Sequence, residues 1–180
     1  MGRPVTARGN PGDGDRTRHA DLRSVDLARW FAEHGRDLPW RHTRDPWAVV
    51  VAEMMLQQTQ VPRVVPRWHR FLRRFPTVVV CAGSPTADVI DEWSGLGYNR
   101  RAVYLHRLAA SVVGDHDGRF PHSLPELLAL PGIGPYTARA IRVFAFELSD
   151  GVLDTNVARI LARTAGRSLA AGEAQRLADG

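Results

Sequence analysis

The sequence contains no lysine, so arginine supplies all of its 24 basic side chains. The absence of lysine excludes covalent catalysis through a lysine Schiff base. Against 19 acidic residues the net charge is +5, which favours nucleic acid as the partner and an acidic protein surface as the second choice. Arginine forks pair well with phosphate, but a GC-rich genome would also enrich arginine, and both explanations stay open.

Cysteine and long apolar runs are also scarce. The one cysteine, Cys81, excludes an internal disulfide framework and a cysteine-ligated metal cluster within this chain, so we expect no metal site. No apolar stretch approaches the roughly 18 residues of a membrane span, and the beginning of the chain has no signal-peptide pattern. We therefore expect a soluble, cytoplasmic, nucleoid-associated monomer without a membrane partner.

What is present is helical periodicity. Residues 1–21 are rich in Gly, Pro, Arg and Asp and predict a disordered basic tail, whereas residues 22–180 predict one helical domain. No segment alternates convincingly with period two, so the fold class is all-α. The helices are expected over about 22–35, 47–59, 62–75, 85–93, 99–113, 123–130 and 135–148, with a last one beginning just after Asp154.

The segment 47–56 carries apolar residues in every direction and a single charge, Glu53. Such a helix should be buried, and a buried carboxyl group has a raised pKa that suits a general acid. The alternative is a partly exposed Glu at a gap in the packing. Gln57 is expected one turn later on the same face, and with its polar neighbours it forms either the rim of a cleft or an ordinary solvated helix end.

The segment 130–136, Leu-Pro-Gly-Ile-Gly-Pro-Tyr, separates two predicted helices. Gly132 and Gly134 permit positive φ and close backbone approach, and Pro135 suits the first position of a helix. The free N–H groups and the dipole of that helix would bind phosphate. A plain helix–helix turn is the alternative.

Asp154 precedes the last predicted helix, where it is expected to be the N-cap. The N–H groups and helix dipole would favour its charged form, whereas burial disfavours the charged form of Glu53. Two carboxyl groups with opposite preferences are typical of an acid and stabiliser pair, although an N-cap Asp is often purely structural.

Five motifs occur in a fixed order. They are Leu38-Pro-Trp-Arg41, Glu53-Met-Met-Leu-Gln-Gln-Thr-Gln60, Gly95-Leu-Gly-Tyr98, Leu130-Pro-Gly-Ile-Gly-Pro-Tyr136-Thr137 and Asp154-Thr-Asn156. From about Leu22 to Ala165, this series resembles the MutY-type adenine DNA glycosylases of the helix–hairpin–helix superfamily. The resemblance implies a helix–hairpin–helix DNA glycosylase fold with two helical lobes. The partner it implies is double-stranded DNA that contains a mismatched adenine.

By this resemblance, Glu53 is the acid that protonates the purine ring of a flipped adenine. Asp154 stabilises the oxocarbenium-like sugar or assists the attack of water. Further positions that match the active site are Tyr136 and Asn156, with Trp40, Arg41 and Leu56 near the base pocket. The expected product chemistry is hydrolysis of the N-glycosidic bond of adenine opposite 8-oxoguanine or guanine.

The resemblance also implies DNA-binding residues. Gln58 and Tyr98 match residues that wedge into the base stack while the nucleotide leaves the duplex. The full predicted set is Gln57, Gln58, Tyr98, Gly132, Gly134 and Thr137. A core position for Tyr98 beside Trp93 and an ordinary surface position for Gln58 are the alternatives.

Tyr136 decides between two branches of the superfamily. Bifunctional relatives of the endonuclease III type carry Lys at this position and cut the backbone through a Schiff base. With Tyr136 and no lysine, the chain is expected to be monofunctional. A thymine/guanine mismatch glycosylase, which can also carry Tyr there, is the alternative enzyme; a catalytically weak DNA-binding remnant is the alternative without turnover.

The sequence departs from the family pattern after the last predicted helix. Full-length members carry a 4Fe-4S cluster on four cysteines there, followed by a domain that recognises 8-oxoguanine. Neither is expected in this chain, and Cys81 matches no cluster ligand. The second lobe is therefore expected to be truncated after about 165. Thr155 also replaces the usual Gly between the Asp and the Asn.

Overall fold

The computed structural model describes residues 24–180, which form helices and contain no β-strand. The elements are α1 (Ser24–His34), the 3₁₀ turn η1 (Pro39–Arg41), α2 (Pro46–Leu56), α3 (Val61–Arg74), α4 (Val78–Ala82), α5 (Thr86–Trp93), α6 (Arg100–Asp115), α7 (Leu124–Ala129), α8 (Pro135–Phe144), α9 (Thr155–Thr164) and α10 (Ala171–Asp179). The all-α prediction is confirmed. The predicted tail, 1–21, lies outside the described residues.

The described residues divide into two compact units, residues 24–36, which include α1, and residues 37–180. Within α1, the indole of Trp30 stacks on the imidazole of His34 with the ring centroids 5.1 Å apart. The helix ends where Gly35 donates its backbone N–H to the carbonyl of Phe31. The second unit holds every residue of the five motifs.

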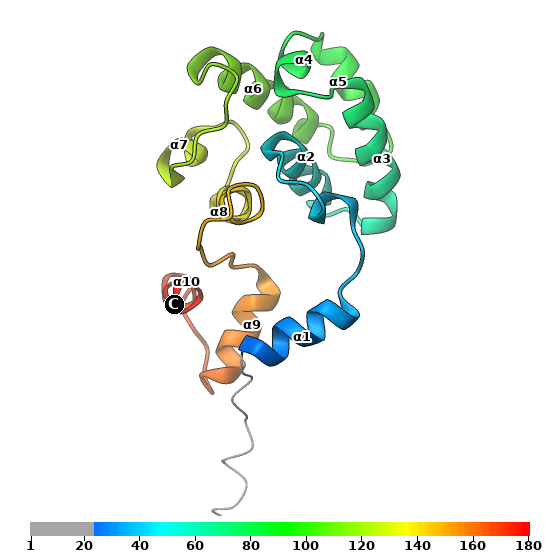
Figure 1. Ribbon diagram of the computed structural model, residues 1–180. Helices are drawn as coiled ribbons and strands as arrows, with labels where there is room; N and C mark the ends of the chain where they lie inside the picture. Colours follow the sequence, from blue (N-terminus) through cyan, green and yellow to red (C-terminus); the bar gives the residue numbers. More distant parts are fainter. Residues whose placement is uncertain (1–23) are drawn as a thin grey trace, which may run out of the picture. The chain divides into compact units, whose positions relative to one another are not determined.

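At the centre of the second unit is α2, which contacts α3, α6 and α8 (Figure 1). The helix begins at Pro46 because Asp45 caps it, accepting the backbone N–H of Trp47 at 3.0 Å. All residues from Trp47 to Met55 are buried. The prediction that an all-apolar helix would be buried is confirmed, and Glu53 is carried into the interior with it.

Aromatic side chains fix α2 against its neighbours. The indole of Trp47 donates to the carbonyl of Phe75 at 2.9 Å, and the indole of Trp68 donates to the carbonyl of Ala48 at 2.9 Å. Both polar groups are thereby satisfied inside the core. Since these bonds join α2 to α3 and its end, the position of Glu53 is determined by packing and not by a flexible loop.

Two predicted helices are shorter in the structure than in the sequence analysis. The second ends at Leu56 and not near 59, because Gln57 leaves the helical region (φ −56°, ψ 111°) and Gln58 has φ 56°. The helix α8 ends at Phe144 and not near 148, and Glu147 then adopts φ 55°. In both places a residue with left-handed backbone redirects the chain.

The short helices α4 and α10 were not predicted. The helix α4 begins after Thr77, whose hydroxyl accepts the backbone N–H of Val80 as an N-cap. The run of Val residues in α4 has low helix propensity. The helix α10 packs on α9 and buries only Ala174, so its apolar pattern is weak. The expectation that the second lobe ends after about 165 did not anticipate this helix.

Within residues 24–180, no helix combines the length and the apolar character that crossing a membrane requires.

Candidate active site and DNA interface

Glu53 is 9% exposed on α2, and burial raises the pKa of its carboxyl group from 4.5 to about 7. Desolvation is the cause of the shift, because the charged form loses its hydration in the apolar surroundings of α2. The alternative of a partly exposed Glu is therefore wrong. Near neutral pH this carboxyl group can both hold and release a proton, as a general acid must.

Tyr136 lies in the first turn of α8, and its phenol has a pKa raised to about 12. Partial desolvation of a side chain that is still 39% exposed contributes most, followed by the negative charges of Glu53 and Asp154. An effect of both carboxylates on one phenol means that α2, α8 and α9 bring these three side chains into one electrostatic neighbourhood. At neutral pH, Tyr136 is a neutral hydrogen-bond donor.

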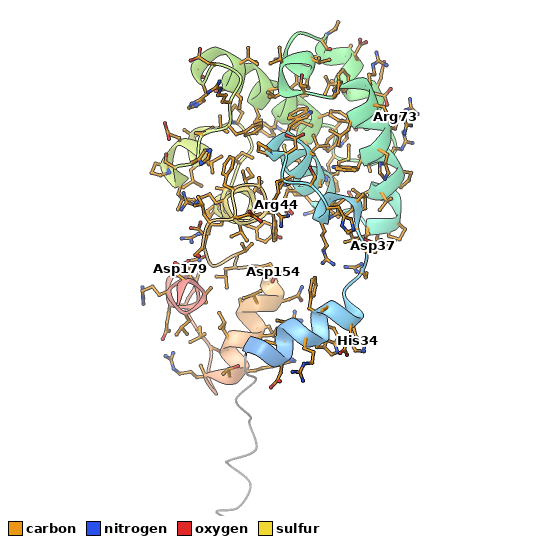
Figure 2. All side chains as sticks on the ribbon, in the orientation of Figure 1. His34, Asp37, Arg44, Arg73, Asp154 and Asp179 are labelled. Carbon is orange, nitrogen blue, oxygen red and sulfur yellow. The ribbon has the colours of Figure 1, made fainter. Side chains whose placement is uncertain are left out.

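Asp154 is the N-cap of α9, as predicted, and it lies at the amino-terminal end of that helix (Figure 2). One carboxylate oxygen accepts the backbone N–H of Val157 at 2.7 Å, and the other accepts the side-chain amide of Asn156 at 3.3 Å. These two bonds fix the orientation of the carboxylate. Asp154 itself is half-buried.

The predicted hairpin, 130–136, is present between α7 and α8. Gly132 has φ 80°, and a Cβ there would fall 2.8 Å from the Cβ of Tyr104, so only glycine fits. Gly134 has an ordinary φ of −102° as the N-cap of α8, and the space around it is open. Of the two glycines that permit positive φ, only Gly132 adopts it.

No side chain caps α8, and its first turn follows the open space at Gly134. The N–H groups of a first turn have no acceptor within their own helix, and with the helix dipole they form a place where an anion binds. Thr137 in this turn is 4% exposed, so its side chain packs inward. The binding of phosphate by the backbone of this turn stays a prediction.

Gln58 and Tyr98, the predicted wedge residues, are both exposed. The side chain of Tyr98 is 67% exposed, so the alternative of a core position beside Trp93 is wrong. Both residues have left-handed backbone, with φ 56° and 48°. That conformation costs about 1 kcal/mol or more for a residue with a Cβ, and it is sustained only where surrounding contacts hold it.

A cavity of about 370 Å³ brings several predicted DNA-binding residues together. It is lined by Met54, Gln57, Gln58, Tyr98, Arg100, Arg101, Tyr104 and Gly132. Glu53 is not among these residues. Gln57 follows the end of α2, so the expectation that it continues the helical face of Glu53 is wrong.

Arg101, which the sequence analysis missed, holds this region together. Its buried guanidinium donates to the carbonyls of Met54 at 2.8 Å, Met55 at 3.1 Å, Leu96 at 3.2 Å and Gly97 at 3.0 Å. It also donates to the carbonyl of Gln57 and to the Thr59 hydroxyl, and it lies over the rings of Trp93 and Tyr98. One side chain thus joins the end of α2 to the turn that carries Tyr98. Nothing in the sequence distinguishes Arg101 from its neighbour Arg100.

The three predicted base-pocket residues lie around α2. Trp40 is 9% exposed and packs edge-on against Trp68, so it belongs to the core. Arg41 is exposed on η1, and Leu56 is half-buried at the end of α2. Their assignment to a base pocket stays a prediction.

The described residues do not fit a metal cluster. Within residues 24–180, no group of three or more His, Cys, Asp or Glu side chains is placed to hold a metal ion. The single cysteine, Cys81, is fully buried in α4, and burial raises the pKa of its thiol to about 12. A thiol of this kind is a packing group and not a ready thiolate ligand.

The chain belongs to the HhH-GPD superfamily of base excision DNA repair proteins, whose family model matches residues 51–176. Curated relatives of the chain include adenine DNA glycosylases. The protein of Mycolicibacterium smegmatis is 44% identical over 140 residues, which cover 77% of this chain and 48% of the relative. The human protein is 40% identical over 146 residues, covering 76% of this chain and 27% of the relative. The chain thus spans about half the length of the mycobacterial relative and about a quarter of the length of the human one.

Solved structures agree with this assignment. A thermostable thymine-DNA glycosylase superposes with a TM-score of 0.79 at 27% identity, covering 86% of this chain and 74% of that one. A trapped endonuclease III–DNA covalent intermediate superposes with a TM-score of 0.73 at 22% identity, covering 84% and 71%. At that identity the second likeness concerns the fold alone. The predicted helix–hairpin–helix glycosylase fold is confirmed.

Proposed function

We propose that this chain is a monofunctional adenine DNA glycosylase, which hydrolyses the N-glycosidic bond of adenine mispaired with 8-oxoguanine or guanine in double-stranded DNA. The observation that carries the proposal is the buried Glu53, with a pKa of about 7, in the same electrostatic neighbourhood as Tyr136 and Asp154. The identity of 40–44% to adenine DNA glycosylases supports adenine as the base.

In the proposed reaction, the protonated carboxyl group of Glu53 donates its proton to a ring nitrogen of the extruded adenine. The bond between the base and C1′ then breaks, and its electron pair leaves with the neutral adenine. The carboxylate of Asp154 stabilises the positive charge that develops on the sugar. A water molecule adds to C1′ and gives its proton to the Glu53 carboxylate, which regenerates the acid and leaves an abasic sugar in an intact strand. Asn156 donates to the carboxylate of Asp154 and orients it, and Tyr136 is the neutral phenol on which both carboxylates act.

The strand stays intact in this proposal because Tyr136 occupies the position at which a lysine would form a Schiff base, and the chain has no lysine. We therefore expect strand cleavage only after hot alkali and no covalent adduct on borohydride trapping. Efficient trapping by the unmodified chain would show that it is a lyase.

The direct test is single-turnover release of adenine from a duplex with an adenine:8-oxoguanine pair, compared between the parent chain and Glu53→Gln. The exposed Glu33→Gln makes the same chemical change at a site without a proposed role, and it should retain the parent rate. Absence of adenine release from the parent chain, with duplex binding retained, would favour a DNA-binding remnant without turnover.

A thymine/guanine mismatch glycosylase is the second candidate, because the thymine-DNA glycosylase shares 27% identity and a TM-score of 0.79 with this chain. Gln57, Gln58 and Gln60 favour adenine by the resemblance to that branch. A panel of duplexes with adenine:guanine, adenine:8-oxoguanine and thymine:guanine pairs separates the two candidates by the base released.

Longer relatives are proposed to hold a 4Fe-4S cluster and an 8-oxoguanine recognition domain outside the segment matched here. No step above depends on either. The chain itself is proposed to act as a monomer on DNA in the cytoplasm, associated with the nucleoid.

A further inference from the structure

The arginines of α3 fall into two groups. Arg70 forms a salt bridge with Glu92 at 2.6 Å, and Arg74 forms salt bridges with Asp88 at 2.9 Å and Glu92 at 3.3 Å. Neither Arg63 nor Arg67, nearer the beginning of the helix, has a salt bridge to an acidic side chain in the part of the chain that the structure describes. Acidic side chains of α5 therefore neutralise Arg70 and Arg74, whereas Arg63, Arg67 and the exposed Arg73 have no such partner among the described residues.

Arg63 and Arg67 both lie against the turn that precedes Tyr98. Arg63 donates a hydrogen bond from its guanidinium to the carbonyl of Gly95. The guanidinium of Arg67 is so close that a Cβ added to Gly95, which has φ 86°, would fall 2.8 Å from its Nη2 atom. Both side chains therefore lie at Gly95, three residues before the exposed Tyr98.

Arginines of two helices lie near the turn from Gly95 to Tyr98. On the side of α6, Arg100 lines the cavity that contains Gln58 and Tyr98, and its guanidinium lies over the ring of Tyr104. On the side of α3 are Arg63 and Arg67. Residues that enter a base stack bring the sugar–phosphate backbone of the flanking nucleotides close to the protein surface around them.

We propose that Arg63 and Arg67 form a phosphate-binding surface, which contacts the backbone of duplex DNA beside the wedge. The proposal rests on the proposed function in taking duplex DNA as the ligand. It adds a second backbone contact to the hairpin at Gly132–Gly134, on a different helix and through side chains instead of main-chain N–H groups.

The chemistry of the pair suits this role. Guanidinium groups bind phosphate oxygens bidentately, and residues four apart on a helix lie on one face, separated by about 6 Å along its axis. Two adjacent phosphates can then each have a partner. Each neutralised phosphate releases counterions, so each contact contributes about 0.9 to the slope of log affinity against log salt.

The test uses the full chain and a duplex without a mismatch, so that adenine release plays no part in it. Affinity is measured between about 50 and 200 mM salt for the parent, Arg63→Gln, Arg67→Gln and the double variant. Each single substitution should lower the salt slope by about 0.9, which corresponds to binding about eightfold weaker at 0.1 M salt. Two independent contacts predict about 60-fold for the double variant.

Arg73→Gln is the matched control, because Arg73 lies on the same helix, is exposed and has no salt bridge within residues 24–180 (Figure 2). It should leave the slope unchanged. Arg67→Lys keeps the charge and should keep most of the slope, which separates charge from a loss of folding. An unchanged slope in the double variant, an equal loss in Arg73→Gln, or no binding of the parent to duplex would each overturn the proposal.

The outcome is separable from that of the proposed function. If the parent chain releases no adenine but the double variant has a smaller salt slope, the phosphate-binding surface stands and the glycosylase function is wrong. If the parent chain releases adenine but the double variant has the parent salt slope, the glycosylase function stands and the phosphate-binding surface is wrong.

Discussion

The two proposed catalytic carboxylates are held in opposite ways. Glu53 lies on a helix with nine consecutive buried residues, surrounded by α3, α6 and α8. Asp154 begins α9, which has no buried residue and packs against α10. Apolar packing of α2 therefore fixes the position of the Glu53 carboxyl group, whereas hydrogen bonds at the start of α9 fix the carboxylate of Asp154.

Polar contacts around α9 and α10 converge on Asp179 at the end of α10. Its carboxylate accepts from Arg139 at 2.7 Å and from the backbone N–H of Gly151 at 3.1 Å. Gln175 donates to the carbonyl of Gly151 at 2.8 Å, and a Cβ at Gly151 would fall 2.4 Å from the carbonyl carbon of Ala178. The helix α10 thus fixes the segment that leads to Asp154, and this difference from α2 can be tested.

The largest expected effect is that of Glu53→Gln on catalysis. Gln keeps the shape of the side chain but has no proton to donate, so single-turnover adenine release should fall by about 10² to 10⁴-fold. In the parent chain, the rate should fall as pH rises through about 7, because the acid loses its proton there. A variant that retains the parent rate would contradict the assignment of the acid.

The same substitution should affect stability with the opposite sign. Because burial raises the pKa of Glu53 from 4.5 to about 7, the folded chain holds this proton more tightly than the unfolded chain. The stabilisation is complete below pH 4.5 and is lost as pH rises through about 7. The loss amounts to about 3 kcal/mol, so Glu53→Gln should be more stable than the parent by that order at alkaline pH. Urea denaturation across this pH range measures it, and parallel pH curves for the two chains would be inconsistent with a buried acid.

The next effect concerns Arg101→Met, which keeps the bulk of the side chain but removes its donors. Several carbonyls at the end of α2 and in the Gly95–Tyr98 turn would lose their partner, at a cost of about 3 kcal/mol. Amide hydrogen exchange should increase in both segments at once. Increased exchange in one segment alone would mean that Arg101 does not couple the two.

The hairpin glycines should differ from one another. Gly132→Ala places a side chain at φ 80° and against Tyr104, which should cost about 1–2 kcal/mol and weaken binding to all duplexes alike. Gly134→Ala has an ordinary φ and open space, so thermal stability should be nearly unchanged. Equal melting temperatures for the two variants would contradict this account of the turn.

The smallest expected effect tests the polar region. Asp179 is 40% exposed, so its pair with Arg139 should contribute only about 0.5–1 kcal/mol in a double-mutant cycle of Arg139→Gln and Asp179→Asn. The backbone N–H of Val157 donates to Asp154, and its hydrogen exchange should nevertheless be faster in the Asp179→Asn variant than in the parent. Unchanged exchange there would mean that α10 does not fix the segment carrying Asp154.

Local patterns were sufficient for much of the fold and for the identity of the proposed acid. The apolar residues on all sides of 47–56 require burial of that helix, and Glu53 follows its helix into the core whatever the remaining topology is. The N-cap at Asp154 and the hairpin at 130–136 depend on side chains and glycines within a few residues, so they too could be predicted from the sequence.

Tertiary structure alone decided the remainder, because it depends on contacts between distant segments. Arg101 and Arg100 are adjacent basic residues, and only the approach of the end of α2 makes one of them a buried donor to six oxygens. Likewise, Arg63 and Arg67 differ from Arg70 and Arg74 only because acidic side chains of α5 reach the latter pair. Helix α10 buries a single residue and is held by side chains of α8 and the linker at Gly151, contacts that no local sequence pattern encodes.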